Sequence, residues 1–209
     1  MPGPFELALN ALRFSSSELF QASCLSCGRV AAKAICPTCT VWPWAAHHPG
    51  ASSQSALTYQ EPWRTVLHAI KLQRFFAFLD LFRPVFEQED FTFIPQSTRI
   101  VPVPIHFSTL WERGFNQSEW LADELGRVTG YAVERDLLGK LKKTPPQRRL
   151  GKDRRARNWK GVFGCRKKAA GSVVLVDDVQ TSGETLRACE AALREGGAER
   201  VYSWTLFRA

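Results

Sequence analysis

The sequence predicts an α/β protein with a parallel sheet and flanking helices, preceded by a small four-cysteine module. Two observations carry this prediction. Apolar strand-like runs alternate with segments of helical periodicity, and parallel strands need helices as crossovers. Four cysteines near the N-terminus also stand in two closely spaced pairs. We therefore expect an N-terminal helix and cysteine module over residues 1–45 and a sheet domain over residues 55–209.

The expected elements follow from apolar periodicity and from Pro, Gly and Ser content. Residues 41–56 carry Pro, Gly and Ser and are interpreted as a linker. Helical periodicity runs from Pro62 to about Gln88, and Pro84 is expected to end or kink that helix. The later pattern predicts, in order, a strand at Arg99–Pro104, a helix at Phe115–Val128, a short strand at Tyr131–Glu134, a strand at Ser172–Val176, a helix at Gly183–Glu195 and a last strand at Arg200–Phe207.

Length and composition fit one globular domain with a small appendage. The chain has 209 residues, of which 44% are hydrophobic and 23% are charged. No apolar run approaches the ~20 residues of a membrane-spanning helix. Residues 1–20 lack a basic leader and a small-residue cleavage site, so they predict a short docking helix rather than an export signal. We therefore expect a cytoplasmic protein, whose cysteines are thiols or metal ligands.

Four cysteines form two CxxC pairs that are separated by eight residues, namely Cys24 and Cys27, then Cys36 and Cys39. Each pair lets one turn present two sulfurs to one ion, and two such turns complete the tetrahedron that Zn²⁺ prefers. We expect a structural zinc site, with two disulfides or unligated thiols as the alternative. Cys165 and Cys189 stand alone and are interpreted as packing residues.

Two adjacent aspartates, Asp177 and Asp178, follow the apolar strand at Ser172–Val176, at the edge where open α/β sheets bind ligands. The next residues, Thr181–Thr185, offer backbone N–H groups and hydroxyls at a helix start, which is a cradle for phosphate. Carboxylates beside such a cradle suit the vicinal hydroxyls of a ribose and a Mg²⁺ ion. The pattern therefore predicts a ribose-phosphate site. An ordinary strand–turn–helix with Asp178 as a cap is the alternative.

The stretch Val173–Leu186 resembles the phosphoribosyl-pyrophosphate (PRPP) motif of type I phosphoribosyltransferases. Further landmarks resemble the ComF (ComFC/GntX-like) competence family. In chain order they are the four cysteines, Tyr59, Leu67–Lys71, Val101–His106, Arg113–Gln117, Thr144–Gln147, Leu150, Arg155, Asn158 and Phe163. Two positions depart from the family pattern. Ser182 replaces the commoner second Thr and keeps the hydroxyl, whereas Lys142 and Lys143 stand where an Arg is usual and cannot make its bidentate fork.

This resemblance implies a type I phosphoribosyltransferase-like fold that binds PRPP together with Mg²⁺. It implies catalytic roles for Asp177, Asp178 and Arg113. The residues expected to contact PRPP are Thr181, Ser182, Gly183, Glu184, Thr185, Lys71, Pro104 and Asn116. The implied reaction moves the phosphoribosyl group from PRPP to a nitrogen nucleophile, and the acceptor stays open. The alternative is a non-catalytic module that senses PRPP and binds DNA or protein.

Positive charge is concentrated in one segment, Lys140–Lys168, which holds thirteen Lys and Arg against one acid. This net +12 leaves −4 on the other 180 residues, because the whole chain carries +8. The segment predicts a hood over pyrophosphate, a track for single-stranded DNA with Trp159 as a stacking surface, or a solvated loop without a ligand. Its expected anion contacts are Lys143, Arg148, Arg155, Arg157 and Asn158. The family resemblance implies natural transformation, with incoming single strands and competence proteins as partners near the inner membrane.

Overall fold

The computed structural model describes residues 23, 24, 27, 29, 35–48, 50–73, 76–143, 159 and 161–209. The helix expected over residues 1–20 lies outside this part of the chain, as do residues 144–158 of the basic segment. At the centre of the fold is a parallel sheet in the order β1-β6-β5-β2. Its strands are β1 (Ser53–Thr58), β2 (Arg99–Pro102), β5 (Gly171–Gln180) and β6 (Ala198–Arg208).

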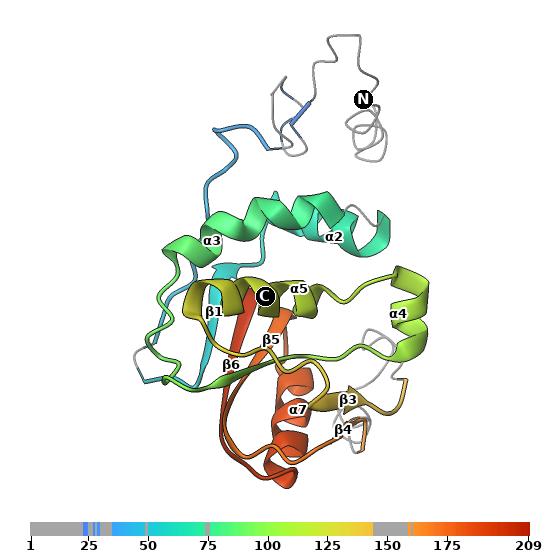
Figure 1. The fold of residues 1–209 in the computed structure, drawn as a ribbon. Coiled ribbons are helices and arrows are strands. Elements are labelled where there is room, and N and C mark those ends of the chain that lie inside the picture. The colour runs from blue at the N-terminus through green and yellow to red at the C-terminus, as the bar shows by residue number, and fades with distance from the viewer. Residues whose placement is uncertain are drawn as a thin grey trace.

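Helices cover both faces of this sheet (Figure 1). The residues of one face, such as Val174 and Val176, pack with the apolar sides of α2 (Trp63–Gln73), α3 (Arg83–Gln88) and α5 (Gln117–Thr129). The other face, with Val173 and Leu175, packs against α7 (Glu184–Glu195) and a small hairpin. β5 is apolar on both sides because it lies between these two layers. The predicted parallel α/β architecture is confirmed.

The predicted helix from Pro62 to Gln88 is three shorter pieces. A 3₁₀ helix, η1 (Phe76–Phe82), lies between α2 and α3. Pro84 stands in the first turn of α3. It therefore begins a helix rather than ending one, because its missing N–H is not needed in a first turn.

The interpretation of residues 41–56 as a linker is wrong for β1. Ser53–Thr58 pairs in parallel with β6, and the hydroxyls of Ser55 and Thr205 lie 2.6 Å apart across the two strands. Trp42, within the same segment, stacks on Trp63 of α2 with ring centroids 4.2 Å apart. The short polar start of β1 has no apolar alternation, so its strand character comes from the edge that β6 offers.

Three further elements belong to the described structure. The helix α4 (Phe107–Arg113) follows β2, and β3 (Leu138–Lys140) pairs antiparallel with β4 (Phe163–Cys165). The strand expected at Tyr131–Glu134 is reduced to one bridge between Val133 and Ile100. Within the described residues, no helix has the length and apolar character needed to span a membrane.

Candidate functional site

Asp177 and Asp178 lie within β5, near its C-terminal end, because the strand continues to Gln180. The sequence pattern alone predicts them after the strand. Successive side chains of a strand point to opposite faces. Asp178 therefore shares the face of Val174 and Val176, and Asp177 shares the face of Val173 and Leu175, although the start of α5 still reaches Asp177 at this end of the strand. The two charges are adjacent in sequence, but they enter different environments.

Asp178 is paired with Lys71, whose Nζ lies 2.6 Å from Asp178 Oδ2. The side chains of Lys71 and Asp178 are only 23% and 13% exposed. The apolar face of α2 packs in the core, and its last turn brings Lys71 to the carboxyl edge. Burial alone would lower the pKa of Lys71, but the Asp178 carboxylate outweighs burial, so that this pKa lies above its ordinary value.

Asp177 accepts two hydrogen bonds at the same oxygen. The hydroxyl of Ser118 and the backbone N–H of Asp178 each donate to Asp177 Oδ1 over 2.9 Å. Burial raises the pKa of Asp177 to about 7, and the negative charge of Asp178 acts in the same direction. Near neutral pH Asp177 is therefore partly protonated.

The turn after β5 is closed by Gly183, whose φ of 72° is in the left-handed region. Gly183 is the N-cap of α7 and provides no side-chain cap, which excludes the alternative of Asp178 as the cap. A Cβ on Gly183 would lie 3.1 Å from Arg187 Nη1 and 3.3 Å from Gln180 Nε2. Glycine adopts this left-handed turn without strain, whereas any Cβ would also push on the ends of two side chains. Thr181 and Ser182 are exposed beside it, and Glu184 and Thr185 open α7.

Arg187 is a cation at this turn that the sequence analysis did not single out. Its Nη2 donates to the carbonyl oxygen of Ser182 over 2.7 Å. Arg187 follows Gly183 by four residues, which in a helix places its side chain back over the preceding turn. This i,i+4 spacing is the signal that could have identified it.

The segment after β2 forms the neighbouring part of the edge. Asn116 is buried and caps α5: its Oδ1 accepts from the N–H of Ser118, and its Nδ2 donates to the carbonyl of Val103. These bonds orient the start of α5, and so hold Ser118 against Asp177. Pro104 is half-buried in the same segment. Direct contact of Asn116 and Pro104 with PRPP stays a prediction.

Arg113 lies in the last turn of α4 and is half-buried. Among the described residues it forms no salt bridge, so the structure offers no surface acid as its partner. Burial lowers the pKa of Lys140, on which the charges of Asp177 and Arg113 also act in opposite directions. Arg113, Lys140 and Asp177 are therefore electrostatic neighbours at this edge.

The described part of the basic segment reaches α7. Trp159 stacks on Phe163 of β4 with ring centroids 5.9 Å apart, and the Nζ of Lys140 lies 6.0 Å from the Trp159 ring. A cavity of about 290 Å³ is lined by Trp159, Glu184, Arg187 and Ala188. Trp159 is thus brought beside the start of α7. Lys143 is exposed and pairs with Glu112 over 3.3 Å. Arg148, Arg155, Arg157 and Asn158 lie outside the described residues.

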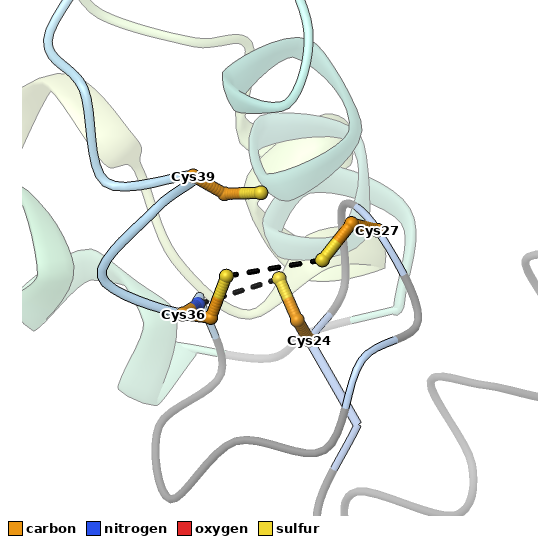
Figure 2. A group of neighbouring side chains, drawn as sticks. All are labelled: Cys24, Cys27, Cys36 and Cys39. Carbon is orange, nitrogen blue, oxygen red and sulfur yellow. Dashed lines mark hydrogen bonds between the residues drawn. The ribbon is translucent and has the colours of Figure 1, made fainter.

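The four cysteines of the two CxxC pairs meet as predicted. Figure 2 shows their sulfurs pointing toward one another, and all four Sγ atoms lie within 4.8 Å of each other. None of the four is in a disulfide, so the disulfide alternative is not what the structure has. A hydrogen bond from the Arg29 side chain lowers the pKa of Cys27 to about 6, toward the thiolate that binds metal. This set of four sulfurs can hold a metal such as zinc.

Cys165 and Cys189 pack against the α7 side of the sheet, as expected. Cys189 is fully buried there, and the Sγ of Cys165 lies 3.3 Å from the carbonyl oxygen of Ala192. Burial raises the pKa of both thiols. Both are therefore inert packing residues.

No family model matches the chain. The DNA utilization protein YhgH of Salmonella typhi is 29% identical over 206 residues, which cover 88% of this chain and 89% of that protein. Competence protein ComFC of Bacillus subtilis is 28% identical over 89% of this chain and 78% of its own length. Competence protein F of Haemophilus influenzae is 34% identical over 114 residues, which are 53% of this chain and 50% of that protein. These similarities, over most of the chain for two of the three relatives, support a ComF-family protein.

Proposed function

We propose that this protein binds PRPP with Mg²⁺ at the carboxyl edge of β5, and that it handles incoming single-stranded DNA in natural competence. One observation carries the ligand proposal: Asp177, Asp178 and Lys71 meet at a strand end beside the turn closed by Gly183. The names of the relatives, which speak of competence and DNA utilization, support the cellular role.

Each group of the proposed site suits one part of the ligand. The hydroxyls and N–H groups of Thr181–Thr185 suit the 5′-phosphate, with Arg187 as an added cation. Asp177 and Asp178 suit the ribose hydroxyls as hydrogen-bond acceptors. Lys71 and Arg113 would meet the pyrophosphate. Mg²⁺ would neutralise the pyrophosphate charge when bound.

The proposed reaction transfers the phosphoribosyl group from PRPP to a nitrogen nucleophile, which attacks the ribose carbon C1′. The bond from C1′ to the pyrophosphate oxygen breaks, and pyrophosphate leaves with its electron pair. A C1′–N bond forms, and the acceptor nitrogen loses a proton. The chain's cations would stabilise the charge that develops on pyrophosphate.

A non-catalytic PRPP sensor is the second candidate, and one observation favours it. Both acids are already engaged inside the chain, Asp178 by Lys71 of α2 and Asp177 by Ser118 of α5. A ligand that takes over these carboxylates must displace both contacts. Occupancy of the site would then bias the positions of two helices, which is how a ligand shifts a conformational equilibrium.

Calorimetric titration with PRPP and Mg²⁺ tests the site. We expect binding to the wild type and at least about tenfold weaker binding, ~1.4 kcal/mol, to Asp177→Asn/Asp178→Asn. Asp123→Asn is the matched control, because Asp123 is exposed on α5 and pairs only with Arg135 among the described residues. Equal affinity in the double variant would place PRPP elsewhere, and no binding to the wild type would refute the ligand. Release of pyrophosphate with an acceptor present would distinguish the enzyme from the sensor.

We also propose that partners recruit the chain, in the cytoplasm, to the competence machinery at the inner membrane. DNA binding of the phosphate-track kind releases counterions and weakens steeply with salt. Affinity for single-stranded DNA that stays constant between 50 and 200 mM salt, about the range over which such binding collapses, would contradict this part of the proposal.

A further inference from the structure

The helix α4 presents an apolar face that nothing in the described structure covers. Phe107, Leu110 and Trp111 stand at positions i, i+3 and i+4, and so share one side of the helix. Their exposed fractions are 74%, 40% and 89%. No residue of α4 is buried. Because a short helix ordinarily docks its apolar side on the protein, this uncovered face indicates a binding surface.

The same surface is where the basic segment begins. Lys143 pairs with Glu112 of α4 and so joins that helix to the end of β3. Leu141, 62% exposed, and Lys142, also exposed, precede Lys143 there. Figure 1 shows α4 at one side of the molecule and β3 and β4 next to one another. Of the seven large hydrophobic side chains that are exposed in the described residues, four belong to this surface. Three of these lie on α4, and the fourth, Leu141, lies two residues before the lysine that contacts α4.

The residue types on this surface indicate what kind of partner it binds. It combines two exposed aromatic rings with Lys142, Lys143 and Arg113, at the start of a segment with net charge +12. Rings between cations are what single-stranded nucleic acids bind, since every base has a face to stack and every nucleotide a phosphate. We propose that single-stranded DNA stacks its bases on Phe107 and Trp111 while its phosphates follow these cations. This inference rests on the proposed DNA-handling function and names the surface for it.

The ends of α4 hold this platform in place before any partner binds. The ring of His106 accepts a hydrogen bond from the N–H of Ser108 at the start of the helix. Gly114, with φ of 84°, ends the helix, and its N–H donates to the carbonyl of Leu110. A pre-formed platform loses little conformational entropy when a base stacks on it.

The test compares four variants in fluorescence anisotropy with a labelled dT20 oligonucleotide. Loss of one stacked base weakens binding by roughly 5- to 150-fold, so we expect Trp111→Ala to lose at least about fivefold. Trp111→Leu should lose as much, because leucine is apolar but has no ring to stack. Trp111→Phe should stay within about threefold of wild type. Val41→Ala is the matched control, because Val41 is 69% exposed and lies outside α4.

The salt dependence separates the rings from the cations. Trp111→Ala should keep the wild-type slope of log affinity against log salt, whereas Lys142→Ala/Lys143→Ala should flatten that slope by about 1.4. Wild-type affinity in Trp111→Leu would overturn base stacking. Loss of binding to vesicles of phosphatidylcholine and phosphatidylglycerol in Trp111→Ala, with DNA affinity intact, would show that the surface meets a membrane instead. Failure of wild type to bind dT20 would refute both this inference and the DNA half of the proposed function, while the PRPP titration tests the other half separately.

Discussion

At the cysteine cluster four like groups face one another within 4.8 Å, whereas at the carboxyl edge of β5 each titratable group faces a partner of another kind. The cysteines come from sixteen consecutive positions, and a metal ion would hold them. The site at the carboxyl edge of β5 brings together residues of α2, α5 and β5. Its residue Asp178 is paired with Lys71, and Asp177 is hydrogen-bonded by Ser118. The difference teaches that the first site is built from a short stretch of chain whose four sulfurs could share one ion, whereas the second is built by the packing of the sheet.

Among the changes that test this difference, loss of a zinc ion from the cysteine cluster should destabilise the protein most. Structural zinc sites contribute ~10–16 kcal/mol of apparent binding energy, so Cys36→Ser should lose the metal and expose the cysteine module to protease. Metal analysis and limited proteolysis measure this. Cys165→Ala is the control and should keep one zinc per chain. Wild-type protein that contains no zinc, and does not respond to a chelator, would contradict the prediction.

Breaking the Lys71–Asp178 pair should have the next largest effect. Lys71→Met leaves a carboxylate with 13% exposure and no counter-charge, and we expect a loss of about 2–3 kcal/mol in the free energy of unfolding. This is less than for a fully buried pair, since Lys71 keeps 23% exposure. Urea denaturation measures it. Arg135→Met breaks an exposed pair with Asp123 and should cost under about 1 kcal/mol. Equal losses in both variants would mean that burial does not strengthen the edge pair.

The stability of the edge should also depend on pH through Asp177, whose pKa is raised from 3.8 to about 7. The folded state keeps the proton that the unfolded state loses, so this contribution is full below pH 4 and is lost as pH rises through 7. Between pH 5 and 8 the wild type should lose about 2 kcal/mol relative to Asp177→Asn. Urea denaturation of both proteins at the two pH values measures this. A constant difference between them would show that the pKa of Asp177 is ordinary.

Gly183→Ala should have the smallest effect on stability and a clear effect on the ligand. Its φ of 72° costs an alanine about 1 kcal/mol, and Arg187 and Gln180 must also shift. Because these side chains border the proposed PRPP site, Gly183→Ala should also weaken PRPP binding, which calorimetry measures. Gly130→Ala is the matched control, because Gly130 has φ of 75° and nothing within 4 Å of an added Cβ. Gly130→Ala should therefore lose similar stability and keep PRPP affinity. Loss of PRPP affinity in both variants would point to general destabilisation.

Features that depend on a short pattern could be predicted from the sequence. The spacing of Cys24, Cys27, Cys36 and Cys39 predicts their convergence, and the structure confirms it. The apolar run before Asp177 predicts a buried strand, and the helix expected at Gly183–Glu195 is α7. Each of these signals spans fewer than twenty residues, so local turn geometry and apolar periodicity are enough to reveal it.

Features that depend on distant partners could not be predicted in this way. β1 begins with the polar residues Ser53, Gln54 and Ser55, and only its pairing with β6 makes it a strand. Arg187 and Trp159 meet at one cavity although their segments lie on opposite sides of β5 in the sequence. The helix α4 was not among the predicted elements, and its uncovered apolar face is seen only in the structure.

By itself, the sequence determined the parallel α/β class, the cysteine module and the position of the acidic pair, because apolar periodicity and residue spacing are local properties. The tertiary structure alone decided which partners the two acids meet, Ser118 of α5 for Asp177 and Lys71 of α2 for Asp178. Lys71 and Asp178 are more than a hundred residues apart, and packing of α2 on β5 brings them to 2.6 Å. At this distance the Asp178 carboxylate outweighs the burial of Lys71 and raises the pKa of that lysine.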